Sequence, residues 1–399
     1  MTDRREKMTT DIVVVGGGII GSSIAYNLDK KGKKIVLLER KGLVSGSSGA
    51  CDQGILLQSK APNEHLRLAI YSLELYKGLS EELRRDIEFE QNGYMVLIEN
   101  EKELEVMKEV VKQQNELGLP SRIISREEAM KLQPGINKEA ITGAAYCEWD
   151  AEVNPYMTAM AYADRAAELG AEIRTYTPVR DLIVEDNCVN GVVTDNEIIY
   201  ADTVINAAGV WANEIAAMAG VEVPIKPRRG QIFISDEFPK FVHKGMINAR
   251  YIVAKHHPEL LKADGSMKAK LGVGLSFTQS KKGNVMFGAT REFVGYDTSN
   301  TVIGLREVLA NATHLVPALK QLNIIRTISG LRPYTPDSKP LIGYIKGLDG
   351  FFMAAGHEGD GISLAPATGK MVAELIVDGK TDIPAVDSFD VNRFNIKVK

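Results

Sequence analysis

The sequence predicts an α/β fold, in which a Rossmann-like, dinucleotide-binding domain carries an inserted second domain of α+β type with its own sheet. Three observations predict this architecture. Residues 11–40 read as a strand, a glycine turn, a helix and a second strand that ends in an acid. Residues 351–379 repeat the order of strand, glycine-rich turn and helix, whereas much of the chain between them is strand-rich. The length of 399 residues also exceeds one ordinary core.

The first strand and turn have the spacing of a dinucleotide cradle. Residues 12–15 form a β-branched run that predicts a buried parallel strand, and the run leads directly into G-x-G-x-x-G. In this pattern Gly16 permits the tight turn and Gly18 lets a pyrophosphate approach the backbone. Gly21 lets the helix pack closely on the strand. The N-terminus of the predicted helix then faces the phosphates.

The second strand of the unit, residues 35–38, ends in Glu39. This acid follows Gly21 by 18 residues, which is where a carboxylate accepts hydrogen bonds from ribose hydroxyls. A glycine-rich turn without a ligand would explain neither Gly18 nor Glu39. The complete unit therefore predicts nucleotide binding.

The next elements follow from composition and spacing. Residues 45–54, SGSSGACDQG, are too rich in small residues for a helix or a strand and predict a loop. Leu66, Ile70 and Leu73 recur at helical spacing, so we expect a long amphipathic helix over 63–83 with this stripe in the core. Strands of a different sheet are expected over 92–98 and 141–146, separated by a charged helix over 101–117.

Strand and helix alternation then returns. Asn154 and Pro155 predict the start of a helix and Gly170 its end. Buried strands are expected over 171–175 and 203–208. The following part is strand-rich, with candidate strands over 232–234, 251–253 and 285–288.

This order predicts a discontinuous domain organisation. The nucleotide-binding domain is expected to comprise residues 10–86, 149–224 and 325–390. The second domain, which contributes the substrate side, is expected to comprise residues 87–148 and 225–324.

Composition excludes several classes of protein. The net charge of −4 and the absence of a long Lys/Arg block argue against nucleic acid as a partner. Cys51, Cys147 and Cys188 lie far apart without C-x-x-C spacing, so no disulfide framework or metal centre is expected, and a reducing cytoplasm fits. The charged first ten residues lack a signal-peptide core, and no later segment reaches transmembrane length. We expect a loose N-terminal tail, with folding from near Thr10.

Three further segments are hard to explain by packing alone. Residues 203–211, TVINAAGVW, form a buried strand that ends in Ala-Ala-Gly, where backbone comes close to another group. Residues 329–343 hold three prolines and an arginine and predict a rigid loop rather than regular structure. In residues 354–370 a glycine-rich turn precedes a helix whose N-terminus faces an electron-rich ring or an anion.

These motifs together resemble the FAD-dependent D-amino-acid oxidase family over nearly the whole chain. They occur in the order GGGIIG, LLER, SGSSG, NAAGVW, RRGQ, GATRE, GLRPYTPD and GHEGDGISLAPATGK. The family includes glycine and sarcosine oxidases and the flavoprotein subunits of proline, hydroxyproline and opine dehydrogenases. The resemblance implies FAD as cofactor and a small amino or imino acid as substrate.

The resemblance also implies individual contacts. Arg332 would bind the substrate carboxylate through a bidentate pair, and Tyr251 would be a tyrosine of the substrate pocket. The FAD contacts would come from Gly16, Gly18 and Gly21 at the pyrophosphate, Glu39 and Arg40 at the adenosine, Ser47, Ser48, Gln53 and Gly54 beside pyrophosphate and flavin, Val179 at the adenine, Ala208 and Gly209 at a second approach, and Gly356, His357, Gly359, Gly361 and Ile362 beside the isoalloxazine.

The sequence departs from glycine oxidase-like relatives at Gly359, where those relatives carry an arginine. The Glu358-Gly359-Asp360 turn implies a roomier, less positive pocket and is more like the dehydrogenase flavoproteins. A secondary amine is therefore the expected substrate, and an electron-transfer partner subunit or a diffusible acceptor is expected. Because none of the cysteines is placed in the loops that tether flavin in some relatives, we expect FAD to be non-covalent.

Simpler roles exist for several of these residues. Arg332 could instead form an ion pair with Asp337 that fixes its own loop, although the planar guanidinium suits a carboxylate ligand equally well. His357, between two glycines, is expected to be a turn residue rather than a catalytic base. Adjacent residues of a strand point to opposite faces, so His256 and His257 are not expected to bind metal, and no metal site is predicted.

Glu358 and Asp360 are expected to be solvated turn residues, with attraction of a substrate ammonium as the alternative.

The function expected is hydride transfer from the α-carbon of an amino or imino acid to flavin. Three alternatives stay open: a glycine or D-amino-acid oxidase that uses oxygen, an FAD-dependent 2-hydroxy-acid oxidation, and a non-catalytic, FAD-holding electron-relay subunit. An intact Arg332 argues against the relay, because a relay needs no carboxylate clamp.

Overall fold

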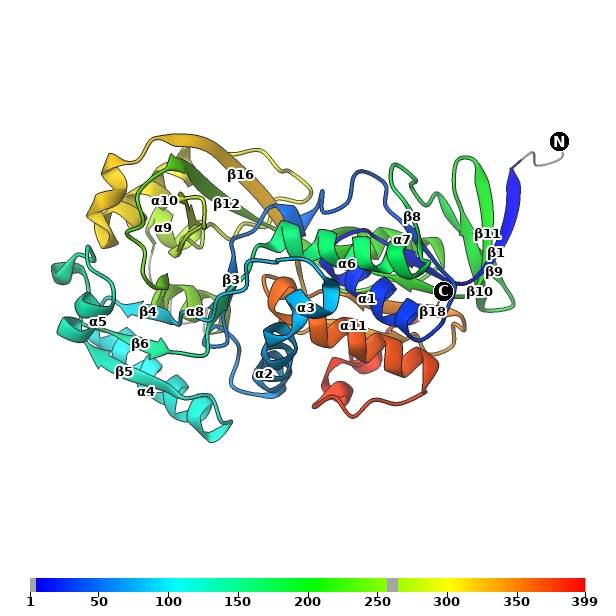
Figure 1. Ribbon diagram of the computed structural model, residues 1–399, viewed down its shortest axis with the longest axis horizontal. Helices are drawn as coiled ribbons and strands as arrows, with labels where there is room; N and C mark the ends of the chain where they lie inside the picture. Colours follow the sequence, from blue (N-terminus) through cyan, green and yellow to red (C-terminus); the bar gives the residue numbers. More distant parts are fainter. Residues whose placement is uncertain (1–4, 257–264, 399) are drawn as a thin grey trace.

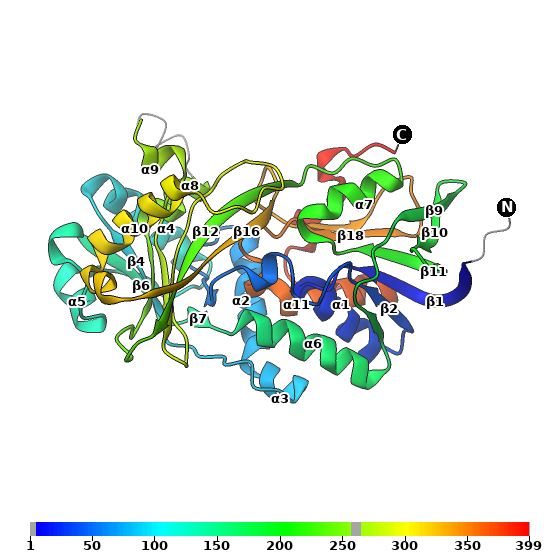
Figure 2. The same cartoon turned by 90° about the horizontal axis from the view of Figure 1, so that it is seen from above.

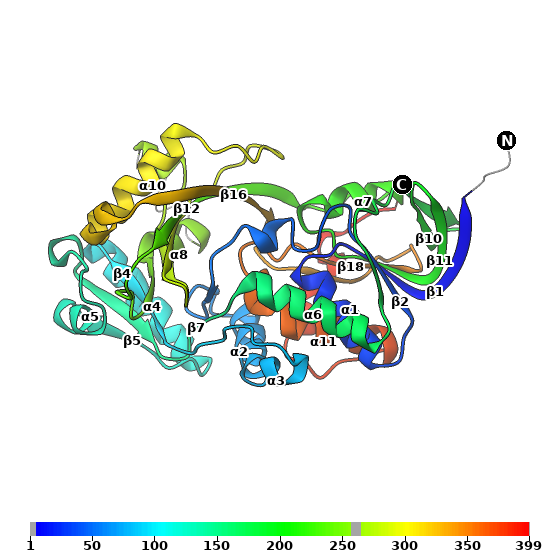
Figure 3. The ribbon, with the colours of Figure 1, turned by 45° about the horizontal axis from the view of Figure 1, so that its top comes forward.

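The computed structural model describes residues 5–256 and 265–398. It contains two eight-stranded sheets that lie side by side, each with its own helices (Figure 1). The long strands β12 and β16 run from the second sheet toward the first (Figure 3). The predicted α/β class is confirmed.

The first sheet is centred on β1 (Glu6–Val15), which pairs in parallel with β11 (Glu197–Asn206) and β2 (Ile35–Leu38). Its strand order is β17-β18-β11-β1-β2-β8, and β10 and β9 continue from β11 as antiparallel strands. The remaining bounds are β8 (Glu172–Arg174), β9 (Asp181–Glu185), β10 (Cys188–Val193), β17 (Leu341–Tyr344) and β18 (Phe351–Ala355).

Helices cover both faces of this sheet. On one face α1 (Ile19–Lys30) packs between α6 (Pro155–Leu169) and α11 (Gly361–Val377), and α7 (Ala212–Met218) lies on the other face (Figure 2). The strands are apolar on both sides, as expected for a parallel sheet between two helical layers. The helices α2 (Glu64–Lys77) and α3 (Leu79–Leu83) extend the layer of α11.

The second sheet has the order β16-β12-β15-β14-β13-β4-β6-β5 and is largely antiparallel. Its strands are β4 (Tyr94–Ile98), β5 (Ser121–Ser125), β6 (Gly143–Cys147), β12 (Lys226–Glu237), β13 (Gly245–Asn248), β14 (Ser276–Gln279), β15 (Asn284–Gly288) and β16 (Ile324–Tyr334). Its helices are α4 (Glu101–Glu116), α5 (Arg126–Leu132), α8 (Ala249–His256), α9 (Met267–Lys270) and α10 (Val302–Leu315). A small ladder, β3 (Gly54–Ile55) with β7 (Ala151–Glu152), makes a third sheet.

Predicted ends of helices and strands are confirmed where they depend on residues adjacent in the sequence. Asn154 caps α6 by accepting a hydrogen bond from the backbone of Met157, and Gly170 ends the helix with φ of 134°. The second strand begins and ends at the predicted residues, Ile35 and Leu38. The predicted helix over 63–83 is interrupted at Gly78, where α2 ends and α3 begins.

Four expectations are wrong. Tyr251–Val253 lies in helix α8, not in a strand, because a short apolar run has no periodicity that separates the two. The segment 329–343 is not one loop, because 329–334 end β16 and 341–343 belong to β17; an edge strand tolerates Pro333 without an amide hydrogen. The tail before Thr10 is partly a strand, since β1 begins at Glu6. The strand β8 is half-exposed rather than buried, because it is an edge strand.

Candidate active site and cofactor cleft

One continuous cavity of about 440 Å³ lies between the two sheets. The carboxyl ends of β1 and β2, the loop after β2 and the turn before α11 line it from the first sheet. Gly230, Ile232, Ser276, Ala289 and Arg332 line it from the second sheet. Every site residue predicted from the sequence lines this cavity except Gly21, Gln53 and Gly54.

The cradle is built as its glycines require. Gly16 has φ of 116°, and a β-carbon there would lie 2.5 Å from the carbonyl oxygen of Ala207. A β-carbon on Gly21 would collide with the carbonyl oxygen of Gly16, so this glycine serves helix packing instead of lining the cavity. The hydroxyl of Ser48 accepts a hydrogen bond from the backbone of Ile19 at 3.1 Å, at the start of α1.

Glu39 and Arg40 line the cavity beside the cradle. The Glu39 carboxylate accepts hydrogen bonds from the backbone N–H groups of Gly17 and Lys41, each at 2.8 Å, and so holds the glycine turn against the end of β2. The guanidinium of Arg40 lies 3.7 Å from the centre of the Trp211 ring. Trp211, which lines the cavity, is a residue that the sequence analysis did not select, although it lies in the NAAGVW segment.

Ala208 and Gly209 follow β11 and line the same cavity, as does Val179. Gly209 has φ of 56°, and a β-carbon there would meet no atom within 4 Å, so it would project into open space. Gln53 and Gly54 do not line the cavity, and both make main-chain contacts with the segment before α6. The Gln53 carbonyl accepts from Val153, and Gly54 pairs with Glu152 in the small ladder.

Arg332 and Tyr251 come together in the same cavity from different elements, β16 and α8. Arg332 donates to the carbonyl oxygen of Thr290 at 3.0 Å. It does not pair with Asp337, whose carboxylate binds Arg393 at 2.8 Å, so that alternative is wrong. Tyr251 lies under the guanidinium of Arg291 at 3.7 Å, and burial raises the pKa of its phenol.

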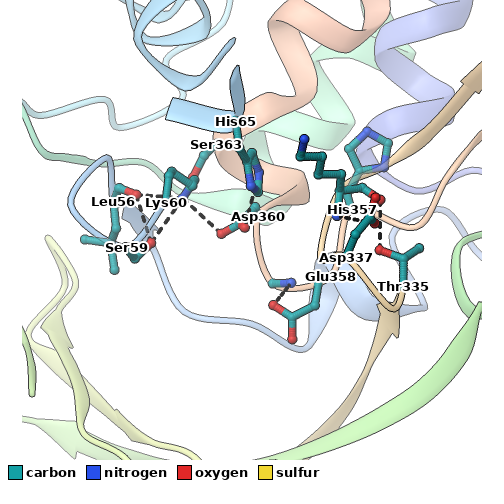
Figure 4. A network of polar contacts seen from close by, with 12 residues as sticks. Leu56, Ser59, Lys60, His65, Thr335, Asp337, His357, Glu358, Asp360 and Ser363 are labelled. Atoms are coloured by element: carbon teal, nitrogen blue, oxygen red, sulfur yellow. Dashed lines mark hydrogen bonds and ion pairs between the residues drawn. The ribbon is translucent and has the colours of Figure 1, made fainter. Parts of the chain in front are cut away.

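The turn before α11 is buried, contrary to the expectation of solvated acids. Glu358 is 4% exposed and pairs with the buried Arg228, which reaches it from β12. Asp360 is 2% exposed and lies 2.9 Å from the ammonium of Lys60 (Figure 4). The two cations come from distant parts of the chain, which is why the sequence around the turn did not reveal them.

Lys60 is itself fully buried and has several partners (Figure 4). Its ammonium donates to the carbonyl oxygen of Leu56 at 2.6 Å and to the hydroxyl of Ser59 at 3.2 Å. His65 contributes a further nitrogen 3.4 Å from Asp360. This network fixes the start of α11 beside the cavity.

His357 is a turn residue, as expected, and is 3% exposed. Its Nε2 lies 3.1 Å from the hydroxyl of Thr368 within α11. Burial lowers the pKa of His357 to about 4, although the nearby charge of Asp360 acts in the opposite sense. The imidazole is therefore neutral at neutral pH.

Cys51 and Asp52 line the cavity, and the sequence analysis selected neither. Cys51 lies in the loop after β2, so one cysteine lines the cofactor cleft. Its thiol donates to the carbonyl oxygen of Ser48 at 3.3 Å, and burial raises its pKa. The carboxylate of Asp52 accepts a hydrogen bond from the hydroxyl of Ser276 on β14. A single acid in a loop of small residues was the only sequence signal for Asp52.

Residues 5–256 and 265–398 contain no cluster of three or more His, Cys, Asp or Glu side chains that could hold a metal ion. His256 ends α8, and His257 lies outside the described residues. Within the same residues, no helix is both long and apolar enough to cross a membrane.

A dinucleotide cleft that continues to a substrate-sized pocket with an arginine defines a cofactor-dependent oxidoreductase. The chain belongs to the DAO family, FAD dependent oxidoreductase, whose family model matches residues 11–375. It is thus an FAD-dependent oxidoreductase and binds FAD.

Relatives of known structure and name agree with this family. L-proline dehydrogenase from P. horikoshii is 35% identical, with a TM-score of 0.87 over 98% of both chains. Glycine oxidase from Bacillus subtilis is 30% identical over 96% of this chain and 97% of its own. Hydrogen cyanide synthase subunit HcnC from Pseudomonas aeruginosa is 28% identical over 92% of each chain.

Proposed function

We propose that this enzyme oxidises the C–N bond of a small amino or imino acid, with a secondary amine such as proline, hydroxyproline, sarcosine or an opine as its substrate. The observation that carries the proposal is Arg332. Its guanidinium lines the cavity, and it forms no ion pair within the described residues. A planar fork without a carboxylate partner suits the carboxylate of a ligand.

The residues around the cavity fit FAD. Gly16, Gly18 and the N-terminus of α1 would hold the pyrophosphate, and Gly209 leaves space that a side chain would fill. Glu39 and Arg40 would bind the adenosine side, Val179 would meet the adenine, and the turn before α11 would lie beside the isoalloxazine. When bound, FAD accepts a hydride from the substrate α-carbon. Arg332 and Tyr251 would orient the substrate for that transfer.

The likeness to L-proline dehydrogenase and the absence of an arginine at position 359 support a secondary amine. Transfer of electrons to a partner subunit or a diffusible acceptor, rather than to oxygen, is part of the proposal. The glycine oxidase relatives support the oxygen-using alternative. We further propose a cytoplasmic location, which the three scattered cysteines support.

The domain division is also proposed. Residues 10–86, 149–224 and 325–390 would form the FAD-binding domain, and residues 87–148 and 225–324 the substrate domain. The two separate sheets support this division, with the difference that β16 pairs with β12 of the second sheet.

The test is an anaerobic screen of amino, imino and hydroxy acids for flavin bleaching, followed by substitution of Arg332. Arg332→Ala should keep FAD and lose most turnover, because loss of one partner of a buried charge pair costs about 2–5 kcal/mol. Arg332→Lys should restore only part of the activity, since an ammonium lacks the fork. The matched control is Arg326→Ala, an exposed arginine of the same strand. Full turnover in a flavin-loaded Arg332→Ala variant would contradict the proposal.

A further inference from the structure

Asp52 lies in the same cavity as Arg332 and Tyr251, and no role follows for it from the dinucleotide cradle. The loop that carries it packs against β16. A β-carbon on Gly330 would lie 2.5 Å from the carbonyl oxygen of Ala50, two residues before Asp52. The charges of Arg332 and Asp52 both act on the Tyr251 phenol. The acid and the arginine therefore both lie near Tyr251 in the cavity.

The carboxylate of Asp52 is held but not neutralised. Ser276, which is buried on β14, donates its hydroxyl to Oδ2. In the part of the chain that the structure describes, Oδ1 accepts no hydrogen bond and no cation pairs with Asp52. Asp52 is only partly buried, and a carboxylate oxygen without a partner in a cavity can take a hydrogen bond from a cationic ligand.

The two other acids near this space are already paired. Glu358 binds Arg228, and Asp360 binds Lys60. Both acids were alternatives for attracting a substrate ammonium, but their ion pairs hold the turn before α11 in place. Of these three acids, Asp52 is the one with a carboxylate oxygen that accepts no hydrogen bond within the described residues.

We propose that Asp52 binds the protonated amine of the substrate, and that it selects amino and imino acids over hydroxy acids. This inference rests on the proposed function and names the charge pattern of its substrate. A zwitterion places its carboxylate on Arg332 and its cationic nitrogen on Asp52. A hydroxy acid supplies the carboxylate but leaves Asp52 without a counter-charge, and sites built for a polar partner reject analogues that lack it.

The test uses two ligands of the same shape, 2-aminoisobutyrate and 2-hydroxyisobutyrate. Neither has an α-hydrogen, so each can bind without being oxidised. Binding to the FAD-loaded enzyme is followed by the change in flavin absorbance. The wild type should bind the amino acid tighter by about tenfold or more, the range expected for a hydrogen bond to a charged group. Asp52→Asn should lose this preference by weakening the amino acid, while the affinity for the hydroxy acid stays equal or rises.

Two further variants separate charge from packing. Ser276→Ala removes the hydrogen bond to Asp52 but keeps its charge, so the preference should remain. Asp382→Asn removes an exposed aspartate and should match the wild type. With an amino acid that bleaches the flavin, Asp52→Asn should lower kcat/KM by about ten- to a hundredfold.

An undiminished preference in Asp52→Asn overturns the inference, and equal affinities in the wild type overturn it without any variant. If amino acids bleach the wild-type flavin while Asp52→Asn behaves as wild type, only the role of Asp52 is lost. If hydroxy acids alone bleach the flavin, the proposed function itself has failed.

Discussion

The guanidinium of Arg332 lies directly against Gly230 on β12, the diagonal neighbour two residues beyond its cross-strand partner Arg228. A β-carbon on Gly230 would come within 2.5 Å of Nη1 and 2.8 Å of Cζ of Arg332. Gly230 therefore leaves the space in which the arginine side chain crosses the strand. Both residues line the cavity, so the position of the guanidinium depends on the smallest residue at 230.

Gly230→Ala should displace Arg332 without touching the cradle. We expect FAD content to stay near one per chain and kcat/KM to fall by about tenfold or more, because a misplaced fork loses one or both hydrogen bonds to a carboxylate. Steady-state kinetics with the best substrate of the screen measures this. The control is Gly78→Ala, where a β-carbon would meet no atom within 4 Å. Equal loss of activity in both variants would contradict a specific effect on Arg332.

The buried pair of Arg228 and Glu358 leads to a prediction about stability. Glu358→Gln leaves the Arg228 charge in a buried site without its carboxylate, which typically costs about 3–5 kcal/mol. Urea unfolding of the FAD-loaded protein should show this loss. Glu105→Gln, which removes an exposed pair with Lys108, should leave the unfolding midpoint close to that of the wild type. Similar unfolding midpoints for the two variants would show that the buried pair is not needed.

Protonation of His357 should destabilise the protein in acid. Its pKa is about 4 in the fold and has an ordinary value of 6.5, so above pH 6.5 the imidazole is neutral in both states and its contribution is complete. As the pH falls from 6.5 to 4, only the unfolded chain takes up the proton, and stability decreases by up to about 3 kcal/mol. His357→Gln should lose less stability over this window, as measured by urea unfolding at several pH values. His314→Gln, at an exposed histidine, should follow the wild type.

Parts of this structure that depend on adjacent residues could be predicted from the sequence. The cradle is one example, because its strand, turn and helix are consecutive and each glycine has a local geometric reason. The cap of α6 at Asn154 is another. The family motifs also placed Arg332 in the cavity, although the strand that carries it was expected to be a loop.

The parts that failed depend on contacts between distant segments. Glu358 was expected to be solvated because its partner, Arg228, is 130 residues away in the sequence. Asp52 gave little signal because its place in the cavity with Arg332 is set by the packing of a loop on β16. Tyr251 was expected in a strand, since an apolar run of this length is compatible with a helix or a strand until its neighbours are known.

We expect FAD to be non-covalent even though Cys51 lines the cavity. Burial, followed by the charge of Asp52, raises the pKa of this thiol, so it stays protonated and is a poor nucleophile. Acid precipitation of the yellow protein should leave FAD in the supernatant, and Cys51→Ala should give the same result. Colour that stays in the wild-type pellet but not in that of Cys51→Ala would show a tether at this residue.

The electron acceptor is the last expectation. Electrons can leave a reduced flavin for oxygen, a partner protein or a diffusible acceptor. The proposed function expects the second or the third route. We expect substrate-dependent reduction of an artificial dye to be much faster than peroxide formation in air, measured on one preparation with one substrate. The Arg332→Ala variant should lower both rates together, because it acts before the flavin is reduced. Peroxide release at the dye rate would make the protein an oxidase and would remove the need for a partner.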